Sequence, residues 1–552
     1  MAICTSNLTS GFIDLATYDE QEKYLYGGPD AVAYFVREIR KATWFTQVPV
    51  CLSARSGQPQ FGQQWSVSIS RAGDYLLYTW LRLTLNSVTA ATANCTYSVA
   101  PTCQPSPTNV ISGAQPNAHV LRWTRNLMHN LIQECAITFN DLVAARFDNY
   151  HLDFWSAFTV PAGKRNGYNN MVGNVDALTN PVALAFPSVS QCLGGAGNPI
   201  NGASGLINVN ASGQQVLPAA TLNLPLPFFF SRDSGLALPT AALPYNEMRI
   251  NFAFRNIWDL LIVDEYRTAS TGVACDAVAD CGYWTSRPAQ QSDLLTQADA
   301  VMGPVNVWAN YAIVSNDERK KMACAPRDIL IEQVQTAPIQ NYNPTTSAPI
   351  DIRFSHAIKA LFWGARNITN PSAWSNYTTS QQLPLGPLDC VSTLNPMFGV
   401  VDFNAGVDPI ASTSLIYENT QRLYQMGSDY FSLVNPWYHA PVIPLETGYH
   451  LYSYSLDFFA IDPMGSTNYG KLTNVSIVPQ GSNDAVSSQQ NPQTSGTVAG
   501  GSITVTSSAP VAVAPLQGAV TPGYGARYCF VTTAVNNNII RISGGALGFP
   551  VL

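Results

Sequence analysis

A short pattern occurs twice in this chain, once in each half. Residues 68–78 align without a gap on residues 353–363, and a second pair of segments, 137–141 and 415–419, recurs at nearly the same spacing. The first alignment pairs Ser70 with Ser355, Ala72 with Ala357, Leu76 with Leu361, and Tyr78 with Trp363. The repeat predicts two tandem β domains of one kind. With no catalytic motif between the copies, it favours an architectural role.

Both halves contain segments in which apolar and polar residues alternate. The clearest are residues 65–70, 81–85, 247–252 and 452–458. A period of two residues is typical of a half-buried strand. Turn clusters rather than helices separate these segments, which favours β-sandwiches over α/β folds. The sequence therefore predicts an all-β chain.

Residues 32–39 are ambiguous. Their apolar side chains have helical spacing behind Asp30, a candidate N-cap. Their β-branched and aromatic content, together with the extended character of residues 43–49, favours a strand. We therefore expect a strand.

Length and composition limit the class of protein. At 552 residues the chain is too long for one core and long enough for two large domains. Charged residues make up only 11% of the chain, and turn-forming and neutral polar residues take their place. The net charge is −7 and the basic residues are scattered apart from the run 319–321, so no nucleic-acid-binding surface is predicted.

Targeting signals are also missing from the sequence. No apolar run reaches the roughly 18 residues of a membrane span, and no basic region followed by an apolar one opens the chain, so we expect neither a span nor a secretory signal. Ala2 stands where N-myristoylation needs glycine. We therefore expect most N-glycosylation sequons to be bare. The sequons are at Asn7, Asn94, Asn210, Asn367, Asn376 and Asn474.

No group of residues stands out as catalytic or metal-ligating. The 11 cysteines include no Cys-x-x-Cys pair, which argues against zinc and against a disulfide framework; Cys95 with Cys103 and Cys275 with Cys281 remain open as loop-closing pairs. No His-x-x-x-His pair, nucleophile elbow, P-loop or dinucleotide-binding fingerprint occurs. We predict no catalytic residue, no cofactor, no metal site and no enzymatic activity. The six histidines are expected in packing or interface roles: His119, His129, His151, His356, His439 and His450.

Long stretches interrupt the strand pattern. Residues 83–121, 177–231 and 485–526 carry no charged side chain, and residues 266–303 form a further stretch between the halves. Long loops of this kind are functional or disordered. We expect exposed loops or contacts between neighbouring molecules, with residues 88–118 on the outer face of the first domain.

One segment resembles a known signature. Residues 224–239, running into 245–250, resemble the PLPFFF-(S/T)-RDSGLALP signature of the major capsid proteins of nucleocytoplasmic large DNA viruses. Residues 34–45 resemble that family's early strand, and residues 354–363 resemble its HPVKxLxW segment, with Ala357 in place of the proline.

Within that family, other segments are similar to iridovirus capsid proteins. They are residues 11–20, 122–131 and 141–155. The resemblance covers almost the whole chain and fails at insertions near residues 90–118, 188–215, 270–300 and 480–515.

The resemblance implies a fold and an assembly. It implies two tandem eight-stranded jelly rolls, a double jelly roll, with long loop insertions. We expect residues 1–28 to form an N-terminal segment that faces the virion interior, 29–265 the first jelly roll, 266–303 a junction, and 304–552 the second jelly roll. Homotrimers would form pseudo-hexagonal capsomers that tile the icosahedral shell of a large double-stranded DNA virus, assembled in the host cytoplasm.

The implied partners are the chain itself, neighbouring capsomers and minor capsid proteins, with the inner viral membrane as a further candidate and no direct contact with nucleic acid.

Two other classes of function remain open. A lectin-like double sandwich would hold sugar in aromatic-rich loops, and a β-rich glycosidase would need paired carboxylates in a cleft.

Overall fold

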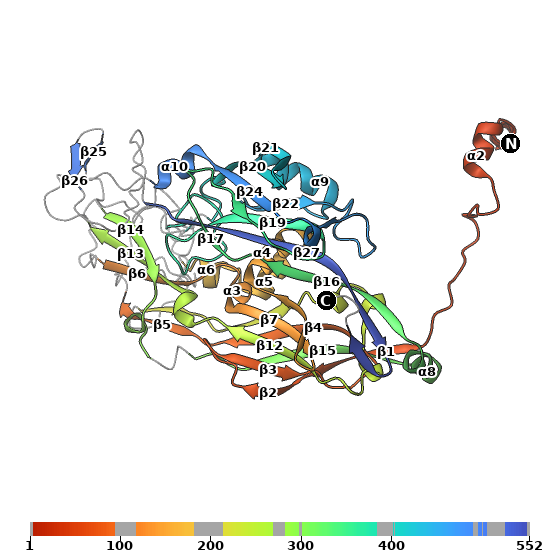
Figure 1. The fold of residues 1–552 in the computed structure, drawn as a ribbon, viewed down its shortest axis with the longest axis horizontal. Helices are drawn as coiled ribbons and strands as arrows, with labels where there is room; N and C mark the ends of the chain where they lie inside the picture. The colour runs from red at the N-terminus through yellow and green to blue at the C-terminus, as the bar shows by residue number, and fades with distance from the viewer. Residues whose placement is uncertain are drawn as a thin grey trace. The chain divides into compact units, whose positions relative to one another are not determined.

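The computed structural model describes residues 4–93, 117–181, 214–268, 282–296, 301–383, 401, 403–489, 495–498, 501–504 and 525–548. The chain divides into two compact units, Met1–Phe45 and Thr46–Leu552. The larger unit holds the β-sheets of the molecule, and most of its elements are antiparallel strands (Figure 1).

The N-terminal unit contains helices α1 (Cys4–Ala16) and α2 (Glu20–Tyr26). Helix α2 begins where the Asp19 carboxylate accepts a hydrogen bond from the backbone N–H of Glu20. Residues 31–44 form neither helix nor strand, so the strand expected at 32–39 is wrong. A strand needs a hydrogen-bonded neighbour, and none of the described strands pairs with this segment.

The first jelly roll consists of two packed sheets. One has the order β1-β15-β4-β10 and the other β2-β3-β12-β7-β8, while β11 pairs with β4. The strands are β1 (Phe45–Cys51), β15 (Val305–Val314), β4 (Tyr75–Leu85), β10 (Ala220–Pro225), β11 (Leu238–Pro239), β2 (Ser53–Gly57), β3 (Gln64–Ser68), β12 (Met248–Phe254), β7 (Ile132–Phe139) and β8 (Leu142–Phe147). Two smaller sheets extend it: β6 (Asn117–Trp123), β13 (Leu261–Thr268) and β14 (Gly282–Pro288), and β5 (Val88–Ala93) with β9 (Gln214–Leu217).

The second jelly roll repeats this plan. One sheet has the order β16-β27-β19-β22 and the other β18-β24-β20-β21. The strands are β16 (Arg327–Thr336), β27 (Tyr528–Ser543), β19 (Ala357–Asn367), β22 (His450–Ser453), β18 (Ile350–Asp351), β24 (Val475–Gly481), β20 (Ile410–Tyr417) and β21 (Thr420–Gly427), with the short β17 (Gln340–Tyr342), β23 (Thr467–Asn468) and β28 (Ala546–Gly548) at its margins and a separate pair, β25 (Ser495–Val498) and β26 (Gly501–Thr504).

Helices are short and lie in the connections between strands. Among the described residues of the larger unit, the α- and π-helices are α3 (Leu127–Leu131), α4 (Asn149–Thr159), α5 (Ala162–Val172), α6 (Asp176–Thr179), α8 (Asn316–Cys324), the π-helix η7 (Tyr430–Val434), α9 (Asn435–His439) and α10 (Asn483–Gln489). Helices α3, α4 and α5 lie between the two sandwiches (Figure 1). No helix among the described residues is long and apolar enough to cross a bilayer.

Four strands of each main sheet in the first jelly roll have a counterpart in the second, and β2 has none, so the strand order confirms the internal repeat. Strands β4 and β19 hold the third place in equivalent sheets. The hairpins β7–β8 and β20–β21 both turn through two residues of positive φ, Asn140 (48°) and Asp141 (66°) in one, Glu418 (47°) and Asn419 (62°) in the other. Paired positive φ angles are the geometry of a type I′ hairpin turn.

One pairing inferred from the repeat is wrong. Leu76 and Leu361 are both buried, as expected, but Tyr78 is 46% exposed while Trp363 is buried. The register of β4 against β15 shifts between Leu76 and Tyr78, so a bulge at Leu77 turns the following side chains to the opposite face. A gapless alignment cannot follow such a bulge.

The expected domain boundaries also need correction. Strand β15 pairs with β4 from Val305 to Ala312, so the first jelly roll ends beyond residue 304. Residues 282–288 form β14 and extend a sheet of the first jelly roll, although residues 266–303 were expected as a junction. Strand β4 lies far from β15 in the sequence, so a local pattern does not reveal that pairing, whereas β14 pairs with β13, the strand directly before it.

Several expectations fall on the insertions. Val88 and Ala90 are buried in β5, so the start of the expected exposed loop at 88–118 is a buried strand. Residues 94–116 lie outside the described residues, as do both candidate cysteine pairs and the sequons Asn94 and Asn210.

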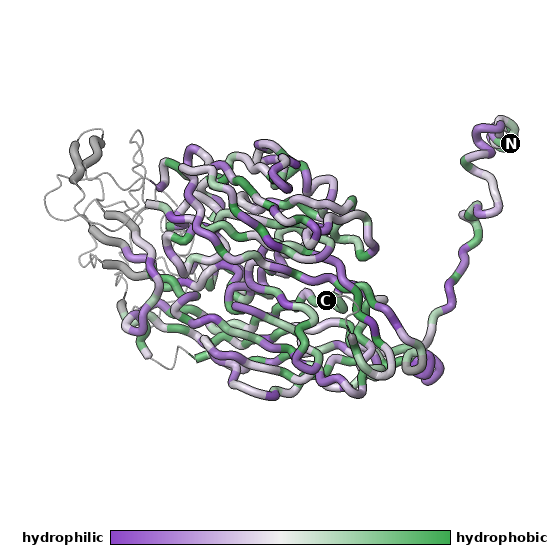
Figure 2. The backbone as a smooth tube through the Cα atoms, viewed as in Figure 1, coloured by the Kyte–Doolittle hydropathy of each residue, from purple (hydrophilic) through white to green (hydrophobic). Residues whose placement is uncertain are grey.

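Burial follows the alternation of the strands. In β12 every second residue from Met248 to Phe254 is buried, and Figure 2 shows hydrophobic and hydrophilic stretches interleaved along the strands. One apolar cluster fills the first jelly roll and a smaller one fills the second. Sheet β16-β27-β19-β22 contributes to both clusters, with Leu361 in the smaller and Phe362 in the larger, so it is buried on both faces.

Candidate functional site

The outer face of the second jelly roll's sheet β16-β27-β19 meets the first jelly roll, and we call this contact the inter-roll interface. Helix α4 is its centre. The Phe154 ring lies 6.2 Å from the Phe362 ring at an interplanar angle of 17°, and the Phe158 ring lies 5.5 Å from the same partner. All three side chains are fully buried. The interface therefore has an apolar, aromatic core of the kind that stabilises permanent contacts.

Helix α4 is fixed in place by its N-terminal cap. The Asp148 carboxylate accepts a hydrogen bond of 2.9 Å from the backbone N–H of His151, as an N-cap residue does. Burial raises the pKa of Asp148 and lowers that of the His151 imidazole from 6.5 to about 3. His151 is therefore a neutral side chain that packs beside Trp155.

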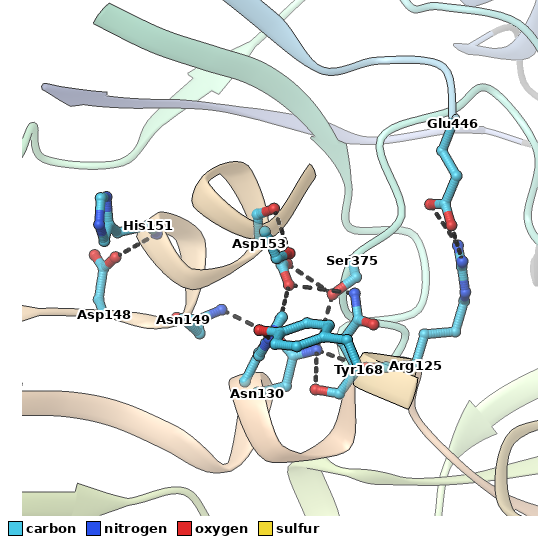
Figure 3. A network of polar contacts seen from close by, with 12 residues as sticks. Arg125, Asn130, Asp148, Asn149, His151, Asp153, Tyr168, Ser375 and Glu446 are labelled. Carbon is cyan, nitrogen blue, oxygen red and sulfur yellow. Dashed lines mark hydrogen bonds and ion pairs between the residues drawn. The ribbon is translucent and has the colours of Figure 1, made fainter. Parts of the chain in front are cut away.

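Asp153 on α4 lies at the centre of a buried polar network (Figure 3). Its Oδ1 contacts His129 Nδ1 at 2.8 Å, and its Oδ2 accepts a hydrogen bond of 2.7 Å from the Ser375 hydroxyl. The other ring nitrogen of His129 lies 2.6 Å from the Tyr168 hydroxyl, whose pKa burial raises. Ser375 belongs to the second jelly roll, so the network joins the two.

This network contains serine, histidine and aspartate but not the order of a catalytic triad. A triad needs the serine hydroxyl on the free nitrogen of a histidine that the aspartate orients. Here Ser375 binds Asp153 directly, and Tyr168 occupies the free nitrogen of His129. The adjacent cavity, lined by Asp153 and Tyr168 among others, has a volume of about 70 Å³, well below the roughly 300 Å³ of a small-molecule pocket. The geometry activates no nucleophile.

A second trio of the same residue types lies in the second jelly roll. His450 Nε2 is 2.8 Å from both Asp408 Oδ2 and the Ser428 hydroxyl, so one nitrogen serves both partners and no proton relay exists. The His450 ring is buried and stacks on Trp363 at 5.7 Å. Among the described residues, no cluster of His, Cys, Asp and Glu could hold a metal ion.

The signature segment 224–239 supplies a further link across the inter-roll interface. Phe228, Phe229 and Phe230 are buried in the first core. Arg232 extends beyond them, forms an ion pair with Glu332 on β16, and lies 4.7 Å from the centre of the Phe459 ring. The sequence of this segment marks the family, but the pattern alone gives no role to Arg232.

The Glu332 carboxylate also forms an ion pair with Lys359 on β19, so two cationic side chains share one carboxylate. Burial lowers the pKa of Arg232 to about 10 and that of Lys359 to about 7, and for Lys359 the nearby Arg232 charge acts in the same direction. Lys359 also donates a hydrogen bond of 2.9 Å to the carbonyl of Ala460. With side-chain exposures of 10% and 11%, Arg232 and Glu332 form a pair that is costly to break from one side.

Two more arginines connect the jelly rolls. Arg122 on β6 forms an ion pair of 2.6 Å with Asp264 and donates to the carbonyl of Gln382 at 3.2 Å. Arg125 pairs with Glu446, and that carboxylate raises the pKa of the guanidinium against the opposing effect of burial. Each contact joins residues that are far apart in sequence.

Residues 33–314 match the family described as the major capsid protein N-terminus, and residues 318–510 match the family described as the large eukaryotic DNA virus major capsid protein. The chain belongs to the major capsid proteins of large eukaryotic DNA viruses. The capsid protein is 56% identical over 554 aligned residues to the major capsid protein of Costelytra zealandica iridescent virus, with both chains covered in full. It is 40% identical to that of Frog virus 3, again with full coverage of both chains.

Solved structures agree on the fold. The capsid protein is similar to the PBCV-1 virus capsid chain with a TM-score of 0.59 at 18% identity, over 94% of this chain and 100% of that one. The Faustovirus major capsid protein gives a TM-score of 0.57 at 13% identity, over 93% of each chain. These likenesses show the double jelly-roll fold. The family match and the relatives named major capsid proteins make this a structural protein rather than an enzyme. The inter-roll interface is the contact that unites its two sandwiches.

Proposed function

We propose that three copies of this capsid protein form a pseudo-hexagonal capsomer and that capsomers tile the icosahedral shell of a large double-stranded DNA virus. The observation that supports this most is the pair of equivalent jelly rolls packed against each other in one chain. Three such chains carry six barrels of one shape, so a three-fold particle can occupy a six-fold position in a flat facet. The names of the relatives agree with a shell role.

Light scattering after size exclusion tests the trimer. The expected mass is three times that of the 59.7 kDa chain, and negative-stain images should show particles with a hexagonal outline. A mass of one chain at micromolar concentration would contradict the proposal. Monomers that hold sugar would instead support the lectin-like alternative.

We assign the N-terminal segment, residues 1–28, to the inner side of the shell. Helix α1 leaves Leu8, Phe12 and Leu15 exposed at 65%, 64% and 72%, which suits an anchor for an apolar partner. That partner is a minor capsid protein, with the inner viral membrane as a second surface and no direct contact with nucleic acid. Deletion of residues 1–28 should leave trimers intact and reduce shell formation, whereas loss of trimers would place the segment in the subunit contact.

The location follows from the same role. The capsid protein belongs to the virion shell, and we propose that assembly takes place in the host cytoplasm. Fractionation of infected cells with an antibody to the chain tests this, since nuclear accumulation of assembled particles would overturn it.

A further inference from the structure

The inter-roll interface joins two surfaces of different kind, one from each jelly roll. The first jelly roll contributes strand β8 and helix α4, which follows it directly in the chain. The second contributes the outer face of sheet β16-β27-β19, where Ile331, Phe362 and Val531 are each 0% exposed. Because the main sheets of the two jelly rolls correspond in strand order apart from β2, each jelly roll should also carry the surface that its partner uses.

The first jelly roll carries the counterpart of the covered sheet face. Sheet β1-β15-β4-β10 corresponds to β16-β27-β19-β22. Its outer face holds Tyr78, Trp80 and Trp308, and the two tryptophan rings stack at 6.2 Å with an interplanar angle of 13°. These rings line an open depression of about 670 Å³. The other described residues that line it are Pro49, the charged Arg82 and the neutral polar residues Gln47, Thr221, Asn223 and Asn310. We call this surface the aromatic face.

The second jelly roll carries the counterpart of the covering surface. Strand β21 corresponds to β8 and leads into η7 and α9, as β8 leads into α4. Phe154 and Phe158 on α4 are fully buried, whereas Trp437 and Tyr438 on α9 are 70% and 72% exposed. Tyr424 on β21 is 62% exposed. We call this surface the α9 surface.

Both surfaces present large aromatic side chains that are exposed or half-buried. Tryptophan and tyrosine are the residues most enriched at the centres of protein interfaces. Each of the two surfaces carries three such residues, and each lies where the internal repeat predicts a contact. The two surfaces therefore indicate a partner that forms a second contact like the inter-roll interface. A second copy of this chain carries the matching jelly roll.

We propose that the aromatic face of one copy binds the α9 surface of a second copy, in the same arrangement in which α4 and β8 bind the second jelly roll within the chain. The contact is heterologous, because the aromatic face of each copy binds the α9 surface of the next copy. In a closed ring of copies every aromatic face and every α9 surface is therefore covered. This inference rests on the trimer of the proposed function and identifies the residues that hold it together.

Photocrosslinking tests the pairing directly. A photoreactive phenylalanine analogue replaces Tyr78 in the full chain, and equal amounts of isotopically light and heavy protein are mixed and assembled together. The expected product is a mixed-isotope crosslink from residue 78 to a peptide within 420–439. Crosslinks between copies that lead only to other segments would overturn the pairing.

Substitutions provide the second measurement. Trp80→Ser and Trp437→Ser should each weaken trimer association by about 30-fold or more, the size of effect typical of a central interface tryptophan. The control is Tyr245→Ser, which removes an aromatic residue that is 76% exposed outside both surfaces and should leave the trimer unchanged. Circular dichroism checks that each variant is folded.

The outcomes separate the inference from the proposed function. A wild-type protein that stays monomeric contradicts the trimer itself and, with it, the pairing. A trimeric wild type whose Trp80→Ser and Trp437→Ser variants remain trimers at the same concentrations overturns only the pairing. Dissociation of both tryptophan variants, with the Tyr245→Ser control intact, supports it.

Discussion

The Ser375 hydroxyl donates a hydrogen bond of 2.7 Å to Asp153 and so joins a loop of the second jelly roll to helix α4 of the first. Both residues are buried, at 3% and 1% exposure. The same hydroxyl accepts a hydrogen bond of 2.9 Å from the Asn130 side chain. One small side chain therefore satisfies two buried polar groups from the other jelly roll.

Ser375→Ala should destabilise the folded chain. Oδ2 of Asp153 would keep only a long contact of 3.4 Å with the Tyr377 hydroxyl, and a buried acceptor left without its partner costs about 1 to 3 kcal/mol. The measurement is the urea midpoint of unfolding. Ser87→Ala is the matched control, because Ser87 is exposed and its loss should change stability by less than about 0.5 kcal/mol. Equal midpoints for the two variants would refute the role given to Ser375.

Arg232→Ala should have a larger effect than removal of an exposed arginine. The substitution leaves Glu332 with Lys359 alone and removes the packing on Phe459, at a cost of about 3 to 5 kcal/mol. Arg541→Ala is the control, because Arg541 pairs with Asp328 at side-chain exposures of 59% and 49% and such pairs contribute about 0 to 1 kcal/mol. Equal losses of unfolding free energy for Arg232→Ala and Arg541→Ala, measured by chemical unfolding, would show that the buried pair contributes no more than the exposed one.

The strands were predictable because their pattern is local. Alternation in residues 65–68 and 248–252 reports which side of a strand is buried, since these residues lie in β3 and β12 and alternate between buried and less buried positions. The strand expected at 452–458 is wrong beyond Ser453, where β22 ends. The repeat was detectable because β4 and β19 face equivalent cores through Leu76 and Leu361.

The features that the sequence did not predict depend on contacts between segments that are far apart in the chain. Strand β15 follows a long insertion and yet lies beside β4, and Arg232 meets a carboxylate 100 residues away. A local pattern contains neither partner. The strand expected at 32–39 was wrong for a related reason: β propensity needs an adjacent strand to act upon, and the described chain offers none there.

Acid should destabilise the protein partly through His151. Burial lowers its pKa to about 3 in the folded state, against 6.5 in the unfolded chain. Between these values the unfolded state binds the proton and the folded state does not, so stability falls as the pH drops from 6.5 towards 3, by at most about 1.4 kcal/mol per pH unit. Unfolding midpoints measured from pH 7 to pH 4 give the slope.

His151→Leu should reduce that slope, because leucine binds no proton in either state. The raised pKa of the neighbouring Asp148 acts in the opposite direction, but Asp148 is present in both proteins, so the difference between their slopes isolates the histidine. Identical slopes for the wild type and the variant would show that His151 does not titrate in this way.

Two of the six sequons should resist glycosylation in the folded protein because they form turns. Asn367 and Asn376 are each 2% exposed. The Asn367 side-chain oxygen accepts hydrogen bonds from the backbone N–H of Thr369 at 3.1 Å and from its hydroxyl at 2.7 Å, and Asn376 binds Thr378 in the same way at 3.1 and 3.0 Å. The Asn-x-Thr pattern here is an Asx turn.

Asn367→Gln should therefore destabilise the chain by about 1 to 3 kcal/mol, because the longer side chain cannot close the turn and leaves buried polar groups unpaired. Asn474→Gln is the control, since it breaks an exposed sequon and should be neutral in the same unfolding measurement. Treatment of the folded protein with a glycosyltransferase, followed by mass spectrometry, should give no sugar at Asn367 or Asn376. Sugar on both, in protein whose circular dichroism spectrum stays that of the folded chain, would show that these turns open in solution and that their burial does not protect them.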